Sequence, residues 1–270
     1  MKIKTALIAL FACSMQAIGQ THLPDMAFDR EFTAQVKSID EFMARFNGDE
    51  IKTGVMSDSL RRDNILSLFD FKMSHEGLND DDFKQQLIDF TNTAINWEKR
   101  LLLSSKGVIA EAKCIVHYAG KQHVVTLLMK RDSTAKGNNK WGIEGVCGLE
   151  KLKLYDDKRV TISPVDHETH FISLQDFFQS NWTLVPSLRA NDKEIDQMSF
   201  FFGLCVAKAI DFVRVDELKF HFMDMPSYIF VVEEIGRKGT NSGWLITKIK
   251  KTLNSSEKKQ YYNNLLNIKE

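Results

Sequence analysis

The chain has 270 residues, of which 43% are hydrophobic and 27% are charged, an ordinary composition for a globular protein. Its 36 basic and 36 acidic residues give a formal net charge of +0 at pH 7. Nucleic-acid-binding proteins usually carry an excess of basic residues, so we expect no nucleic-acid partner. No segment beyond the N-terminus has the roughly 20 consecutive apolar residues that a membrane-spanning helix needs, so we expect no membrane span.

The first 19 residues have the order of a secretory signal peptide. Two lysines precede an apolar run over residues 5–12, and Ala17 and Gly19 are small residues of the kind found before a signal peptidase site. The sequence therefore predicts cleavage before Gln20 and export to the periplasm or the cell exterior.

A lipoprotein lipidated on Cys13 is the alternative. Residues 10–13 resemble a lipobox, although Phe11 is bulky where a small residue is usual. Lipidation would attach the protein to a membrane and make it a candidate subunit of a membrane-attached assembly.

Helices are predicted first in the mature chain. Ser38 is a favourable N-cap for a helix that ends at Gly48, and residues 58–69 have a second helical pattern. A third helix begins at Asn79, where three aspartates lie near the positive end of the helix dipole. Its apolar stripe has helical spacing and consists of Phe83, Leu87, Phe90, Ala94 and Trp97.

The apolar pattern then changes to a period of two, which indicates strands. Alternation covers residues 114–118 and, after a tight turn at Gly120 and Lys121, residues 123–129. A polar loop over residues 132–140 leads to a third strand that starts at Trp141. The first half therefore predicts helices followed by an antiparallel meander.

The second half repeats this plan in the same order. The matching segments are 38–43 with 173–178, the helix starts at 79–80 and 191–192, 116–118 with 220–222, and 137–143 with 239–246. The apolar stripe of the second-half helix consists of Ile195, Met198, Phe202, Cys205 and Ala209. Four matches in order favour a tandem duplication. The polar stretch 150–158 is the predicted linker, so we expect a signal peptide over residues 1–19, one unit over 20–152 and a shorter unit over 153–270.

Each predicted unit resembles the NTF2-like (cystatin-like) α+β superfamily. The resemblance is carried by the hairpin at 114–129, the loop and strand at 137–143, and their counterparts at 218–235 and 239–246. It implies an α+β fold of two units, each with helices packed on its own curved antiparallel sheet, often around a pocket. The superfamily includes enzymes, binding modules and assembly proteins, so the fold alone does not choose a function.

Histidines are the first candidates for chemistry. His123 belongs by alternation on the apolar face, across the hairpin from Tyr118, where a pocket histidine could act as an acid or base. A hydrogen-bonded histidine at the strand end is the alternative. His117 and His221 each lie between apolar neighbours and should point away from the apolar face, as surface or interface histidines.

The candidates for ligand binding are Tyr118 and His123 beside the hairpin, together with two tryptophans at the predicted strand starts. Trp141 and Trp244 occupy matching positions in the two halves, where they could stack on a sugar or a peptide. The alternative is that they pack in the core, a role that both copies would need equally.

No metal or cofactor site is predicted. His167 and His170 are three residues apart, but they lie at a predicted helix start where the neighbouring acidic residues fit an N-cap. Cys114 and Cys147 are expected to share the inner face on the first and third strands, too far apart for a disulfide. No Gly-x-Ser-x-Gly, Walker or Gly-x-Gly-x-x-Gly motif occurs.

The function expected first is a non-catalytic binding or scaffold module that binds a peptide, a glycan or a protein partner. The alternatives are an isomerase- or dehydratase-type pocket enzyme that uses His123 with a nearby carboxylate, and the lipid-anchored assembly subunit.

Overall fold

The computed structural model describes residues 36–50, 57–73, 78–133, 139–152, 179, 196–238 and 241–266. Its fold class is α+β, as predicted. The helices are α2 (Ile39–Asn47), α3 (Asp58–Ser67), α4 (Asp80–Asn96), α6 (Gln197–Val206) and α7 (Ser255–Leu265), with a 3-10 turn, η1 (Leu149–Leu152). The strands are β1 (Val108–Tyr118), β2 (Lys121–Ser133), β3 (Asn139–Cys147), β4 (Ile210–Phe222), β5 (Tyr228–Ile235) and β6 (Gly243–Lys251). The predicted signal peptide, the histidines at 167 and 170, and the 173–178 segment lie outside these ranges.

The local signals for the first three helices are confirmed. The Ser38 hydroxyl accepts a hydrogen bond from the Glu41 amide at 3.1 Å, and Gly48 ends α2 with a φ of 80°. The Asn79 side chain accepts from the Asp82 amide at 2.9 Å, so α4 begins where its sequence predicts. Each cap satisfies an amide that the first turn of a helix leaves without a partner.

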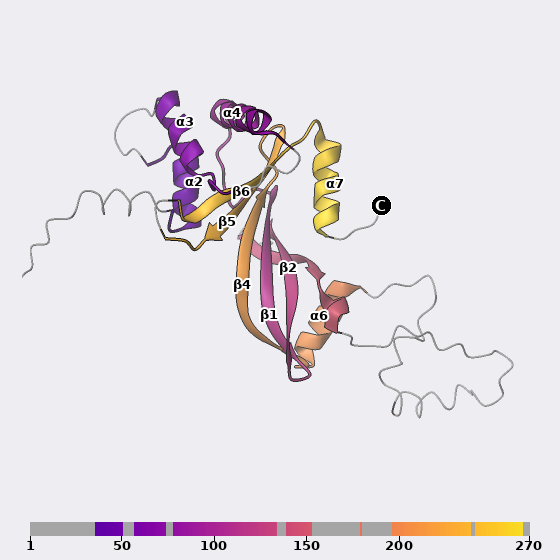
Figure 1. The fold of residues 1–270 in the computed structure, drawn as a ribbon. Helices are drawn as coiled ribbons and strands as arrows, with labels where there is room; N and C mark the ends of the chain where they lie inside the picture. The colour runs from indigo at the N-terminus through magenta and orange to yellow at the C-terminus, as the bar shows by residue number, and fades with distance from the viewer. Residues whose placement is uncertain are drawn as a thin grey trace, which may run out of the picture.

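The strands of both halves form one curved, antiparallel sheet in the order β3-β2-β1-β4-β5-β6 (Figure 1). The first strand of one meander pairs with the first strand of the other, and the register places Ala110 opposite Phe220. The prediction of a separate sheet for each half is therefore wrong. Alternation shows which side chains share a face of a strand, but it does not show which strand becomes the neighbour.

The helices pack across the two halves. The larger core cluster joins α2, α3 and α4 to β4, β5 and β6, and the smaller one joins α6 and η1 to β1, β2 and β3. Both clusters lie on one face of the sheet, the helix face, because β1 contributes alternate residues first to one cluster and then to the other. The helices α2, α3 and α4 thus cover mainly strands of the second half, and α6 covers mainly strands of the first half, whereas η1 packs on strands of its own half.

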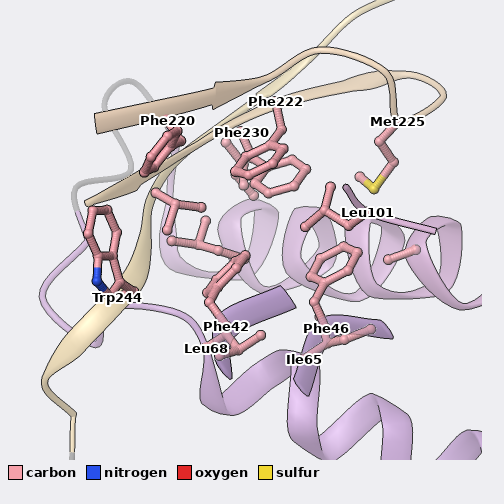
Figure 2. Close-up of a cluster of buried hydrophobic side chains, with 14 of the residues drawn as sticks. Phe42, Phe46, Ile65, Leu68, Leu101, Phe220, Phe222, Met225, Phe230 and Trp244 are labelled. Carbon is pink, nitrogen blue, oxygen red and sulfur yellow. The ribbon is translucent and has the colours of Figure 1, made fainter. Parts of the chain in front are cut away.

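Phenylalanines dominate the larger cluster (Figure 2). Phe46 stacks on Phe230 with ring centroids 5.6 Å apart, and Phe222 stacks on Phe230 at 4.9 Å. Phe90 of α4 meets Phe230 edge-on at 5.4 Å. Aromatic pairs at these distances add to the free energy gained by burying their surfaces. Phe90 and Ala94 are buried, as expected for the predicted stripe of α4.

The predicted stripe of α6 is wrong. Phe201 is its buried residue, whereas Phe202 and Cys205 are exposed. The sequence of this helix is apolar on every side, so the spacing of its apolar residues could not identify the buried face.

The second face of the sheet, the α7 face, carries helix α7 (Figure 1). Lys258 of α7 donates hydrogen bonds to the carbonyls of Met223 and Met225, at 2.7 and 2.5 Å, in the connection from β4 to β5. Near the other end of the helix, a Cβ atom added to Gly145 of β3 would lie 2.6 Å from the Leu266 side chain. Helix α7 therefore bridges connections and strands from both halves.

The two cysteines of the first meander lie on opposite faces. Cys114 is paired with Val125, whereas Cys147 is paired with Thr126, the next residue along β2. The expectation that both sulfurs lie on the inner face fails because a β-bulge between Leu128 and Met129 shifts the register of β3. Their separation across the sheet excludes a disulfide between them.

Candidate functional site

His123 and Tyr118 lie near the tip of the β1–β2 hairpin. The turn is formed by Ala119 and Gly120, with φ values of 49° and 74°, one residue before the predicted position. His123 is opposite Val116, and therefore on the helix face, and its ring is 6.2 Å from the Tyr118 ring. Within the described ranges, the structure places no carboxylate in a hydrogen bond or ion pair with His123.

The predicted tryptophan pair converges on one core residue. Trp141 of β3 and Trp244 of β6 lie 6.3 and 5.4 Å from the Phe220 ring, measured between centroids. Trp244 is buried, and Trp141 is partly buried against the larger cluster. Strands at opposite edges of the sheet thus bring these rings to the same phenylalanine, which is possible because the sheet is strongly curved. This arrangement agrees with the core-packing interpretation.

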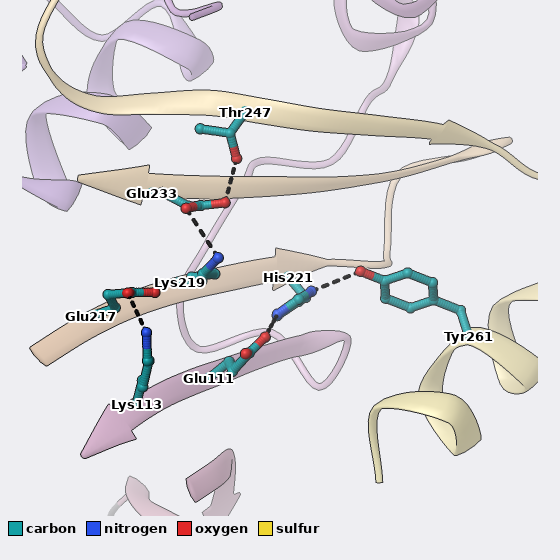
Figure 3. A network of polar contacts seen from close by, with 8 residues as sticks. All are labelled: Glu111, Lys113, Glu217, Lys219, His221, Glu233, Thr247 and Tyr261. Atoms are coloured by element: carbon teal, nitrogen blue, oxygen red, sulfur yellow. Dashed lines mark hydrogen bonds and ion pairs between the residues drawn. The ribbon is translucent and has the colours of Figure 1, made fainter. Parts of the chain in front are cut away.

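The two matched histidines have different surroundings. His117 is exposed, whereas His221 is 4% exposed and lies on the α7 face. Glu111 of β1 has Oε2 at 2.8 Å from His221 Nε2, and the Tyr261 hydroxyl of α7 is 2.8 Å from Nδ1 (Figure 3). Alternation correctly predicted that His221 points away from the helix face, but both of its partners were missed.

Two pKa shifts indicate the hydrogen-bonding roles of the partners of His221. The hydrogen bond with His221 lowers the pKa of Glu111, against the opposing effect of burial, so the carboxyl is held as an acceptor. Burial, together with the nearby Glu111 charge, raises the pKa of Tyr261 to about 12. In a neutral His221, Nε2–H therefore donates to Glu111 and Nδ1 accepts the hydrogen bond from the tyrosine hydroxyl.

This Tyr–His–Glu arrangement docks a helix onto the sheet. Both nitrogens of His221 already have partners from the chain, and the raised pKa of Tyr261 keeps its hydroxyl protonated. A nucleophile needs the opposite, a lowered pKa or an adjacent base that accepts its proton in reach of a substrate. The three residues instead join β1, β4 and α7.

Charged pairs continue across the α7 face beside this network (Figure 3). Lys113 of β1 pairs with Glu217 of β4 at 2.5 Å, and Lys219 of β4 pairs with Glu233 of β5 at 3.2 Å. Glu233 also accepts from the Thr247 hydroxyl of β6 at 2.7 Å. Opposite charges on neighbouring strands support the register of the sheet, each by a few tenths of a kcal/mol to about 1 kcal/mol.

A different kind of surface lies at residues 210–217, which we call the β4 edge. Along this stretch, β4 pairs with β1 on one side, whereas its described pairing with β5 covers residues 219–222 alone. Phe212 and Val215 are opposite Val116 and Cys114, and therefore on the helix face, yet they are 54% and 49% exposed. A sheet edge that exposes apolar side chains among charged ones can serve as a docking site for another chain.

Sequence reasoning missed the β4 edge because two β-bulges break its alternation. Val213 and Asp216 are extra residues relative to β1, so a period of two cannot be followed through them. The available signal was the run Phe212–Val213, two adjacent apolar residues in a strand with charged residues on both sides.

Comparisons with known proteins identify no relatives: no model of a protein family matches the chain, and neither a curated protein nor a solved structure does. In the described part of the chain, no group of three or more histidine, cysteine, aspartate or glutamate side chains is arranged to hold a metal ion. None of the helices described is both long and apolar enough to cross a membrane.

Proposed function

We propose that this protein is a non-catalytic binding or scaffold module whose binding surface includes the β4 edge. The observation that carries the proposal is the exposure of Phe212 and Val215 on a strand whose described pairing is one-sided. Exposed apolar side chains beside unpaired backbone groups favour the addition of a strand from a partner.

The main polar cluster supports a binding role in preference to a catalytic one. Glu111, His221 and Tyr261 are engaged with one another and hold α7 on the sheet. For the enzyme alternative, His123 would need a carboxylate within hydrogen-bond reach, and no such contact occurs in the described ranges.

Export is part of the proposal and is supported by the pattern of residues 1–19. Mass spectrometry of the N-terminus of protein recovered from the producing cell tests it. An N-terminus at Gln20 is the expected result. A diacylated Cys13 would instead support the lipid-anchored assembly subunit, and an intact Met1 would remove export altogether.

We further infer that the two halves arose by duplication of an NTF2-like unit. The sheet order supports this inference, because β3-β2-β1 and β4-β5-β6 are two meanders that meet through their first strands. Helices packed against a curved sheet support the family resemblance. A solved structure in which the two meanders fail to superpose by a twofold rotation would contradict duplication.

Photo-crosslinking in the producing cell tests the binding role. A photoreactive amino acid at Val213, which is 42% exposed on the β4 edge, should give covalent adducts with a protein partner. The matched control is the same amino acid at Leu253, which is 83% exposed between β6 and α7. The absence of adducts at Val213, or equal adducts at both positions, would contradict the proposal.

A further inference from the structure

We propose that helix α7 is a detachable cover, which leaves the sheet as one unit while the rest of the fold stays closed. Its departure uncovers a strip of apolar side chains on the α7 face. This face is opposite the one that carries Phe212, so the inference does not depend on the proposed binding role of the β4 edge.

The strip beneath α7 is almost fully buried. Its register with the Glu111–His221 pair places four apolar side chains on the α7 face, because paired residues share a face of the sheet. They are Ile109, Leu128 and Ile229, each 1% exposed, and Val231, which is 5% exposed. Without a cover, these side chains would face water.

Two tyrosines of α7 carry the helix across the sheet. The Tyr261 ring is 5.9 Å from the His221 ring of β4, and Nζ of Lys250 on β6 is 5.7 Å from the Tyr261 centroid, so the ring bridges the two sides of β5 (Figure 3). The hydroxyl of Tyr262 donates to Glu144 of β3. One helix therefore contacts both the β4–β6 and the β3 sides of the sheet.

Helix α7 is itself loosely held, in contrast to the strip that it covers. None of the residues Ser255–Leu265 is buried, and none belongs to the two core clusters on the helix face. The six strands pair with one another, so the ladders of the sheet do not include the backbone of α7. An element with few buried contacts opens at a lower free energy than the core of its protein. Detachment of α7 would thus break side-chain contacts alone.

The connection from β6 to α7 supplies a pivot. Thr252 is buried, and its amide donates to the Ser227 carbonyl at 2.8 Å, so the end of β6 stays fixed. The next residue, Leu253, is 83% exposed, and the helix begins two residues later. Rotation at residues 253–254 can therefore release α7 without disturbing β6.

Native-state hydrogen exchange of the purified chain, measured by mass spectrometry, tests the proposal. The amides of α7 should exchange roughly tenfold faster, or more, than those of β4 and β5, after correction for their intrinsic rates. Tyr261→Phe removes the hydrogen bond to His221, and Leu266→Ala removes the side chain beside Gly145. Each should speed exchange roughly fivefold along the whole of α7 and leave β4 and β5 unchanged. The matched control, Leu253→Ala, should alter neither.

The cysteines of the chain report whether α7 leaves the sheet. Cys147 lies on the α7 face, with Sγ at 3.9 Å from the Leu265 carbonyl oxygen. Cys205 is exposed on α6, and Cys114 is buried on the helix face. Tyr261→Phe and Leu266→Ala should therefore speed the reaction of Cys147 with a thiol reagent by the same factor as the exchange of α7, whereas Cys205 and Cys114 should react as in the parent chain.

Three results would each overturn the proposal. Amides of α7 that exchange as slowly as those of β4 and β5 would make the helix part of one cooperative unit with the core. Acceleration confined to the turn beside each substitution would indicate fraying. Faster exchange of α7 without faster reaction of Cys147 would show that the helix unwinds in place. None of these measurements involves a partner, so the Val213 crosslinking experiment tests the proposed function separately.

Discussion

The two ends of the helix face are built differently, although their sequence patterns match. At the β5–β6 end, three helices cover the strands, and Val36 and Phe69 form bridges with the edge strand. At the end formed by β1–β3 and the β4 edge, α6 and η1 cover the strands, and Phe212 stays exposed. We call the β5–β6 end the sealed end and the other the open end. Strands with similar alternation are thus covered to different extents, depending on how many helices and bridging segments the rest of the chain supplies.

The largest expected effect is on the sealed end. Phe90→Ala removes a ring that lies within 5.2–5.4 Å of the Phe69, Tyr228 and Phe230 rings, measured between centroids. A cavity in such a cluster should lower the free energy of unfolding by about 3–5 kcal/mol.

The matched variant at the open end is Phe201→Ala. Phe201 belongs to the smaller cluster and has the exposed Phe202 as its ring neighbour, so its loss should cost about half as much. Urea denaturation of both variants measures the difference. Equal losses would show that the open end is as tightly packed as the sealed one.

Two glycines with positive φ, Gly243 at the start of β6 and Gly120 in the β1–β2 turn, allow a second comparison. Gly243 has a φ of +88°, and a Cβ atom there would lie 2.0 Å from the Val36 carbonyl oxygen. Gly243→Ala should therefore displace the segment that seals β6 and cost about 2–3 kcal/mol.

Gly120 is the control for backbone strain alone. Its φ is +74°, but a Cβ atom would meet nothing within 4 Å, so Gly120→Ala should cost only about 1 kcal/mol. Thermal unfolding distinguishes the two variants. If Gly120→Ala lowered the free energy of unfolding as much as Gly243→Ala, the bridge between Val36 and Gly243 would add little to stability.

An effect as small as that of Gly120→Ala is expected at the junction of the two ends, where His221 joins β4 to Glu111 and to α7. Because the pKa of Glu111 is lowered in the folded chain, its carboxylate stabilises the fold above the ordinary pKa of glutamate. That contribution is lost as the pH falls through the lowered, folded-state pKa. Glu111→Gln should therefore reduce stability by about 1 kcal/mol at neutral pH, and the difference should shrink in acid.

Denaturation of the parent chain and Glu111→Gln at a series of pH values measures this dependence. The control is Glu217→Gln, which alters the neighbouring exposed pair with Lys113 and should change stability little. A difference that grows in acid would contradict the assigned direction.

Short-range features could be predicted from the sequence. The caps at Ser38 and Asn79, the stripe around Phe90 and the β1–β2 hairpin each depend on residues close together in the chain, and all are found. The pairing of β1 with β4 depends on which distant segments bury each other, and no local pattern contains that information.

The site residues divide in the same way. The orientation of His221 followed from alternation, but Tyr261 lies on a later helix, and only the folded chain brings its hydroxyl to the imidazole. Phe212 was missed because the bulges at Val213 and Asp216 interrupt the period of two. The period of two predicted which face each side chain occupies up to each β-bulge, and it failed beyond the bulge.

The first-half helices pack on second-half strands, and this limits when the larger core cluster can form. The rings of α2 and α4 are made early, but the strands that cover them, β5 and β6, are near the C-terminus. A nascent chain must therefore carry these phenylalanines uncovered until almost all of it has been synthesised. Contacts between segments so distant in sequence form slowly. The larger cluster therefore cannot be completed before β5 and β6 are present, and neither half has its full complement of core partners before the other arrives.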